Sequence, residues 1–200
     1  MDLPVTPAAQ RLALLENYLR EDPANPALLE EASAAALEAG QPARVLALAE
    51  AAQALGLQGP GWDFRRAQAL IAQRQLDAAQ ALLERLLGSA PHHPTLLHDL
   101  AFTRFLRGDL AGCQQTLAPL LTADWREGSA LGDAVQMLWL RAAHRLDQGA
   151  RAWEWATAQQ QAGTLLPRAA GVASLIGVDE GHFGAAEALA RIAVAVDPHQ

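Results

Sequence analysis

Three histidines and an aspartate lie close together in the stretch PHHPTLLHD, residues 91–99. Histidine nitrogens and carboxylate oxygens can bind zinc. However, His93 and His98 are five residues apart across the start of an expected helix, so they do not form an i, i+4 pair on one face. We therefore expect His92, His93, His98 and Asp99 to belong to a solvated loop and a helix start, with no metal site and no cofactor.

Cys113 is the single cysteine, which excludes an internal disulfide and a cysteine-based zinc site. A reactive thiol needs an electropositive and partly open setting. Cys113 stands at a position that small or medium residues occupy elsewhere in the chain, so we expect a buried structural thiol. The stretch DEGH, residues 179–182, is expected to be a turn rather than a metal site.

All fifteen basic residues are arginines, and the chain contains no lysine. This excludes chemistry that depends on a lysine, such as a Schiff base, a phosphate-loop NTPase or a protein kinase. The formal net charge is −7 and no basic stripe is visible, so we expect no nucleic acid partner. We predict no catalytic residues.

The first residues, MDLPVTPAAQ, lack a basic region followed by an apolar run, so no signal peptide is expected. No apolar run approaches the roughly 20 residues that span a bilayer. The sequence therefore predicts a soluble cytoplasmic protein without membrane insertion.

Half of the residues are hydrophobic, with alanine and leucine dominant and aromatic residues scarce, which favours helix over strand. Residues of three kinds recur every 34 positions. They are Pro26, Pro60 and Pro94; Gly40, Arg74 and Gly108; and Val45, Ala79 and Cys113. Pro167 and Gly181 continue the first two series after an interval that equals two periods and five extra residues.

We predict a single domain, 1–200, made of a leading helix and five windows that each form a helical hairpin. The leading helix covers 8–22, and the windows are 26–59, 60–93, 94–127, 128–166 and 167–200. The fourth window holds the five extra residues, either in the loop 124–133 or in a lengthened helix over 130–146; we favour the loop over the turn 146–149. Each hairpin has too little core to stand alone and must stack on its neighbour.

In this pattern the chain resembles the tetratricopeptide repeat family, whose repeat has the same period, a turn residue between two helices, a small residue opening the second helix and a closing proline. The last window fits best. It supplies Gly181, Phe183, Ala186, Ala190, Ala193 and Pro198. The resemblance implies an all-α solenoid, a right-handed superhelix of antiparallel hairpins, that binds a peptide or partner protein in a concave groove lined by the first helices.

We predict that first-helix residues directed away from the stacking contacts line this groove. They are Phe64, Arg65, Gln68, Ile71, His98, Phe102, Phe105, Met137 and Arg141. Exposed aromatic residues beside arginine are typical anchors of protein interfaces. Some members of the family bind the carboxylate tail of a chaperone with lysines and asparagines on the groove helices. We expect no such clamp here, because the chain has no lysine and its asparagines, Asn17 and Asn25, lie near its N-terminal end.

The last expected helix is apolar nearly all round, at Leu189, Ile192, Val194 and Val196. Repeat arrays usually finish with a capping helix whose outer face is polar. The alternative function is therefore a self-assembling structural or regulatory subunit, which forms a homodimer through these residues.

Overall fold

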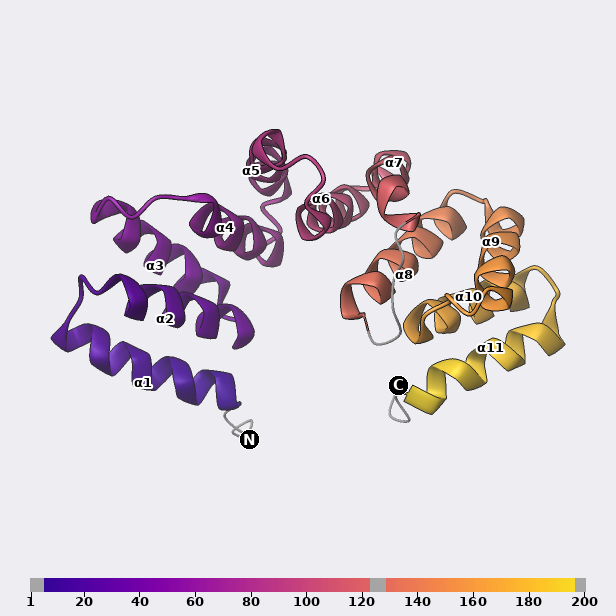
Figure 1. Cartoon of the computed structure of the whole chain (residues 1–200), viewed down its shortest axis with the longest axis horizontal. Helices are drawn as coiled ribbons and strands as arrows, with labels where there is room; N and C mark the ends of the chain where they lie inside the picture. Colours follow the sequence, from indigo (N-terminus) through magenta and orange to yellow (C-terminus); the bar gives the residue numbers. More distant parts are fainter. Residues whose placement is uncertain (1–5, 123–128, 197–200) are drawn as a thin grey trace. The chain divides into compact units, whose positions relative to one another are not determined.

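The computed structural model of the chain describes residues 6–122 and 129–196. Within these residues the protein consists of eleven α-helices and has no strand (Figure 1), so the all-α class is confirmed. The helices form two compact units, an N-terminal unit (Met1–Pro91) and a C-terminal unit (His92–Gln200).

The N-terminal unit is built from a leading helix followed by two hairpins. Its helices are α1 (Pro7–Glu21), α2 (Pro26–Glu38), α3 (Pro42–Ala54), α4 (Pro60–Ala72) and α5 (Leu76–Ser89). Proline opens the first four of them, at a position where its missing N–H costs nothing. The core of the unit joins α1 to α4, with Leu12, Leu29, Val45 and Trp62 among its buried members.

The C-terminal unit contains three hairpins. Its helices are α6 (Pro94–Arg107), α7 (Leu110–Leu121), α8 (Ala130–Arg145), α9 (Gly149–Gln161), α10 (Pro167–Asp179) and α11 (Phe183–Val196). One continuous core includes Ala101 from α6, Leu117 from α7, Leu140 from α8, Trp153 from α9 and Leu189 from α11.

In each unit, every helix packs against the helices that precede and follow it in the chain (Figure 1). The first helices of successive hairpins also touch, since α2 contacts α4, α6 contacts α8 and α8 contacts α10. Packing in chain order is the defining property of a solenoid. The expected α-solenoid is therefore confirmed for the two units.

Each hairpin turns through a residue with a positive φ angle. These residues are Gly40, Arg74, Gly108, Asp147 and Gly181, with φ between 55° and 84°. Glycine adopts this left-handed conformation without strain, whereas Arg74 and Asp147 adopt it at some cost. Successive turn residues keep the period of the sequence everywhere except between Gly108 and Asp147, so the five extra residues lie in that interval.

The small residue predicted to open each second helix follows its turn residue by five positions. The set is Val45, Ala79, Cys113, Ala152 and Ala186, and every member is at most 1% exposed. Alanine-sized side chains at these points let the two helices of a hairpin approach closely. Residues 124–128 of the favoured insertion loop 124–133 lie outside the described residues, while residues 130–133 belong to the 16-residue helix α8, in line with the lengthened helix that was the alternative. The turn between α8 and α9 keeps the same three-residue length as that between α4 and α5.

Polar contacts from α8 hold the start of α10. The Asp133 carboxylate accepts hydrogen bonds from the backbone N–H groups of Arg168 (3.2 Å) and Ala169 (2.9 Å). The Gln136 amide, only 3% exposed, donates to the Thr164 carbonyl and accepts from the Leu166 N–H, each at 2.9 Å. Leu166, the N-cap residue of α10, makes no side-chain hydrogen bond to the start of the helix. Side chains of the preceding repeat therefore cap α10.

Gly177 on α10 lies against the Trp153 ring of α9, where the last two hairpins pack closely. A Cβ at this position would lie 2.8 Å from Cη2 of Trp153, whose ring is buried and stacks on His182. We expect Gly177→Ala to lower the free energy of unfolding by roughly 1–3 kcal/mol through overpacking, as measured by urea denaturation.

Gly184 provides the matched control, because it also lies in a helix but has no atom within 4 Å of an added Cβ. Gly184→Ala should leave stability unchanged or raise it by up to about 1 kcal/mol. Equal effects of the two substitutions would contradict the close packing of Trp153 on α10.

Candidate functional site

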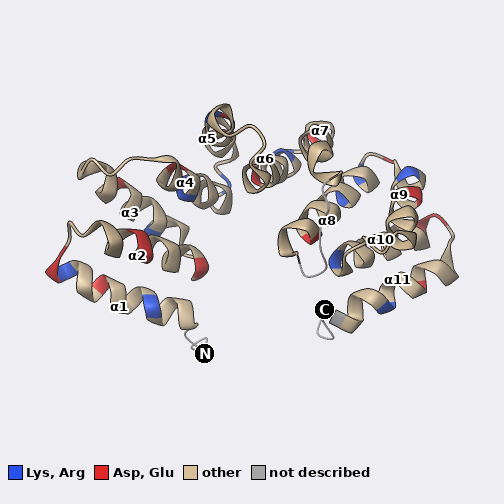
Figure 2. Cartoon of the chain, in the orientation of Figure 1, with Lys and Arg blue, Asp and Glu red and all other residues tan. Residues whose placement is uncertain are grey.

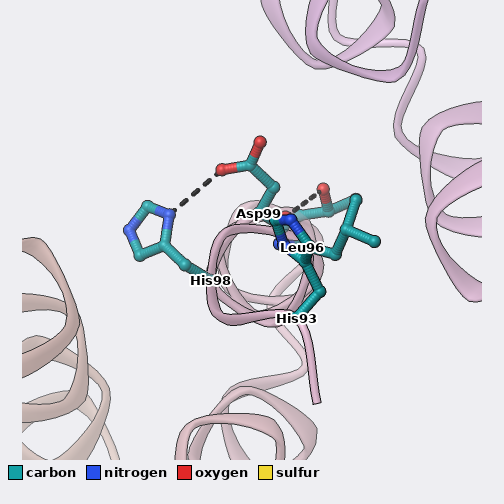
Figure 3. Close-up of polar contacts among 5 residues, drawn as sticks. His93, Leu96, His98 and Asp99 are labelled. Carbon is teal, nitrogen blue, oxygen red and sulfur yellow. Dashed lines mark hydrogen bonds and ion pairs between the residues drawn. The ribbon is translucent and has the colours of Figure 1, made fainter. Parts of the chain in front are cut away.

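The histidines of residues 91–99 have separate structural roles. The His93 ring caps α6 by accepting a hydrogen bond from the Leu96 N–H at 3.4 Å, while His98 Nδ1 lies 3.0 Å from the Asp99 carboxylate (Figure 3). His98 also stacks on Phe102, with 6.4 Å between ring centroids. Among the described residues, no group of three or more histidine, cysteine or acidic side chains could hold a metal ion.

Cys113 is buried in the core between α6 and α7. Burial raises the pKa of its thiol to about 12, and the nearby Asp109 carboxylate acts in the same direction, while Arg104 opposes them. A thiol with this pKa is protonated at neutral pH and is a poor nucleophile. The geometry thus gives Cys113 a packing role.

The repeat register identifies the surface that the first helices leave open. Six residues before each turn residue of the C-terminal unit stand Phe102 on α6, Arg141 on α8 and Leu175 on α10, and all three are exposed. Phe102 is 37% exposed and Leu175 is 65% exposed. We call Phe102, Arg141 and Leu175, with His98, Phe105, Met137 and His144 beside them, the first-helix surface.

Two contacts join the three helices along this surface. The Arg145 guanidinium of α8 lies over the Phe105 ring of α6, 5.1 Å from its centroid. On the other side of α8, His144 Nε2 lies 2.9 Å from the Asp179 carboxylate of α10. Residues three or four apart share a helix face, so Arg141 lies near both contacts and Leu175 lies one turn before Asp179.

The chemistry of the first-helix surface is mixed apolar and charged. Phe102 and Leu175 are large apolar side chains, and Arg141 between them is a guanidinium that can donate several hydrogen bonds. Figure 2 shows acidic and basic residues spread over the helices of both units rather than gathered on one of them. This combination suits a protein ligand, which offers both apolar side chains and hydrogen-bond acceptors.

The groove residues predicted in the N-terminal unit all lie on α4, and none of them is fully exposed. Phe64 and Gln68 are half-buried on α4. Arg65 lies over the Trp62 ring at 5.3 Å and approaches Glu30 of α2 at 4.0 Å, so it bridges two first helices. The prediction that Ile71 lines a groove is wrong, because its side chain is 9% exposed and counts among the buried core residues.

The predicted end contact is also revised. Leu189 is 3% exposed and belongs to the core, so it offers no open face, while Ile192 is partly buried against that core. Helix α11 turns both residues toward its own unit. Val194 is exposed, while the side chain of Val196 lies outside the described residues. The homodimer itself stays a prediction.

Leu175 is the residue that the sequence interpretation missed. Its offset from Phe102 is the same as the offset that relates Pro167 to Pro94. Extending the groove prediction to the last repeat would have found it. Among the described tryptophans, Trp153 is buried against α10, and Trp155 packs on Trp139 with ring centroids 4.8 Å apart.

Comparison with known families supports the interpretation of the repeats. A tetratricopeptide repeat model matches residues 70–131, a stretch that contains two of the turn residues, Arg74 and Gly108. Residues 70–131 are thus similar to the tetratricopeptide repeat family. No curated protein matches it. Repeats of this family generally mediate protein–protein interactions, and their fold is typically a non-catalytic scaffold.

Within residues 6–122 and 129–196, no helix combines the length and the apolar character needed to cross a bilayer.

The buried thiol predicts an alkaline loss of stability. Because the folded state binds the Cys113 proton more tightly than the unfolded state, its stabilising effect is complete below about pH 9 and is lost as the pH rises toward about 12. We expect urea unfolding midpoints of the wild type to fall over this range more steeply than those of Cys113→Ala. The absence of lysine and the single tyrosine leave few other groups that titrate there. Parallel curves for the two proteins would contradict the assignment.

Proposed function

We propose that this chain is a non-catalytic scaffold that binds a peptide or partner protein on the first helices of its hairpins. The observation that carries the proposal is the exposure of Phe102 and Leu175 at equivalent positions of the first-helix surface. Large apolar side chains usually lie inside a domain, and exposed ones that recur at one repeat position suit an interface.

The physical basis of binding is the burial of a few anchors. Phe102 contributes a rigid aromatic ring that already stacks on His98, so little side-chain entropy remains to be lost on binding. Arg141 supplies hydrogen-bond donors, and Met137 can adapt its flexible side chain to an irregular partner. On the first helices of the N-terminal unit the proposed contacts are Phe64 and Gln68, both half-buried on α4.

The proposal is tested by affinity capture from the native host followed by mass spectrometry. We expect the double variant Phe102→Ala, Leu175→Ala to lose the partners that the wild type retains, since truncating an interface anchor costs at least about 2 kcal/mol, or roughly thirtyfold in affinity. Because both side chains are exposed, thermal unfolding should change little.

Leu14→Ala is the matched control, because Leu14 is 51% exposed on α1, a helix that contributes no residue to the first-helix surface. This variant should keep the same partners as the wild type. Retention of all partners by the double variant, or their equal loss in the control, would rule out the first-helix surface as the binding site.

A further inference from the structure

A pocket of about 380 Å³ opens on the side of α4 that is opposite to Phe64 and Gln68. It lies within the N-terminal unit, between the second helices α3 and α5. Its main lining residues are Gln53, Leu57, Trp62, Asp63, Arg66 and Arg85. The spacing of Trp62, Arg66 and Leu70 by four residues places them along one face of α4, and none of them belongs to the first-helix surface.

The charges of the pocket do not cancel. The Arg85 guanidinium donates to the Asp63 carboxylate at 2.8 Å, and the two form an ion pair. The Arg66 guanidinium instead donates to the neutral amide oxygen of Gln53 at 3.1 Å. Two guanidinium groups therefore share one carboxylate among the lining residues, which leaves one positive charge in a chain of net charge −7.

A second hollow, of about 260 Å³, continues from the first and shares Asp63, Arg66 and Arg85 with it. Its remaining lining residues are apolar: Leu70, Ala78, Ala81 and Leu82. A cationic end is thus joined to an aliphatic end along α4. Arg66 and Leu70 are four residues apart, about 6 Å along the helix axis.

An extended peptide matches this arrangement. In an extended chain, side chains two residues apart point to the same side and are separated by roughly 6–7 Å. A carboxylate side chain and an aliphatic side chain at positions i and i+2 would reach Arg66 and the hollow beside Leu70 together. Arginine binds carboxylates through a planar pair of N–H donors.

We propose that the two joined hollows bind an extended segment of a partner protein in which an acidic residue is followed, two positions later, by an aliphatic residue. The carboxylate pairs with Arg66, and the aliphatic side chain packs between Leu70 and Leu82. The inference rests on the proposed interaction role only because the ligand is a protein segment, and it uses none of the residues of the first-helix surface.

The test is an NMR titration of the full chain with the blocked peptide acetyl-Gly-Glu-Gly-Leu-Gly-amide, to about 1 mM. We expect shifts at Gln53, Trp62, Arg66 and Leu82. Replacing the peptide's Glu by Gln, or its Leu by Gly, should weaken binding, by about tenfold for the loss of the charge-assisted bond. Equal binding of the three peptides, or no shift with the first, overturns the proposal.

Three variants of the protein sharpen the test. Arg66→Gln should weaken binding about tenfold, while Arg151→Gln, which makes the same charge change at an exposed residue of α9, should leave it unchanged. Asp63→Asn should strengthen binding, because it releases Arg85 and removes the competing carboxylate. Circular dichroism verifies that the variants are folded.

The outcomes separate this inference from the proposed function. An unchanged affinity in Arg66→Gln, or a weakened one in Asp63→Asn, would refute the pocket assignment whatever partner capture shows. Failure of the Phe102 and Leu175 variants to lose partners would leave the peptide titration unaffected.

Discussion

The structure depends on how closely the two helices of each hairpin can approach. The contact is made where a small side chain follows the turn residue by five positions, at Val45, Ala79, Cys113, Ala152 and Ala186, all at most 1% exposed. A larger residue there would push the helices apart and open cavities on both sides, because protein interiors are close-packed. The same constraint explains Gly177, whose lack of a Cβ leaves room for the Trp153 ring. Individual repeats can vary widely in sequence as long as these contact points remain small.

Much of the fold could be predicted from the sequence because its signals are local. The regular spacing of proline, turn residue and small residue reports helix starts, chain reversals and contact points, each set by a few neighbouring residues. The burial of Ile71 and Leu189 could not be predicted in this way. Ile71 stands three residues before its turn residue, and the equivalent positions are half-buried at Phe105 but exposed at His144, so the outcome depends on the neighbouring helix. Leu189 lies in a helix that is apolar on most sides, and such a pattern does not identify the inward face.

The two candidate surfaces also differ in how far local sequence signals predict them. Phe102, Arg141 and Leu175 follow from the repeat register alone, since each lies six residues before a turn residue. The cationic hollow beside Arg66 does not, because it needs side chains from α3, α4 and α5 to meet, and the Asp63–Arg85 pair joins residues 22 positions apart. The protein thus presents two apolar side chains and an arginine on the first helices of one unit, and a charged hollow beside the second helices of the other. The two surfaces differ in chemistry, and we propose that they bind different partner segments.

The hydrogen bonds from Asp133 and Gln136 to the start of α10 have a mechanical consequence. They connect the fourth and fifth hairpins through the backbone of the intervening connection, so α10 cannot leave α8 without exposing uncapped N–H groups and a buried amide. In most solenoids terminal units can peel away one at a time. Here the last two hairpins should detach as a single block when the chain is stretched, which makes the C-terminal end resistant to gradual fraying.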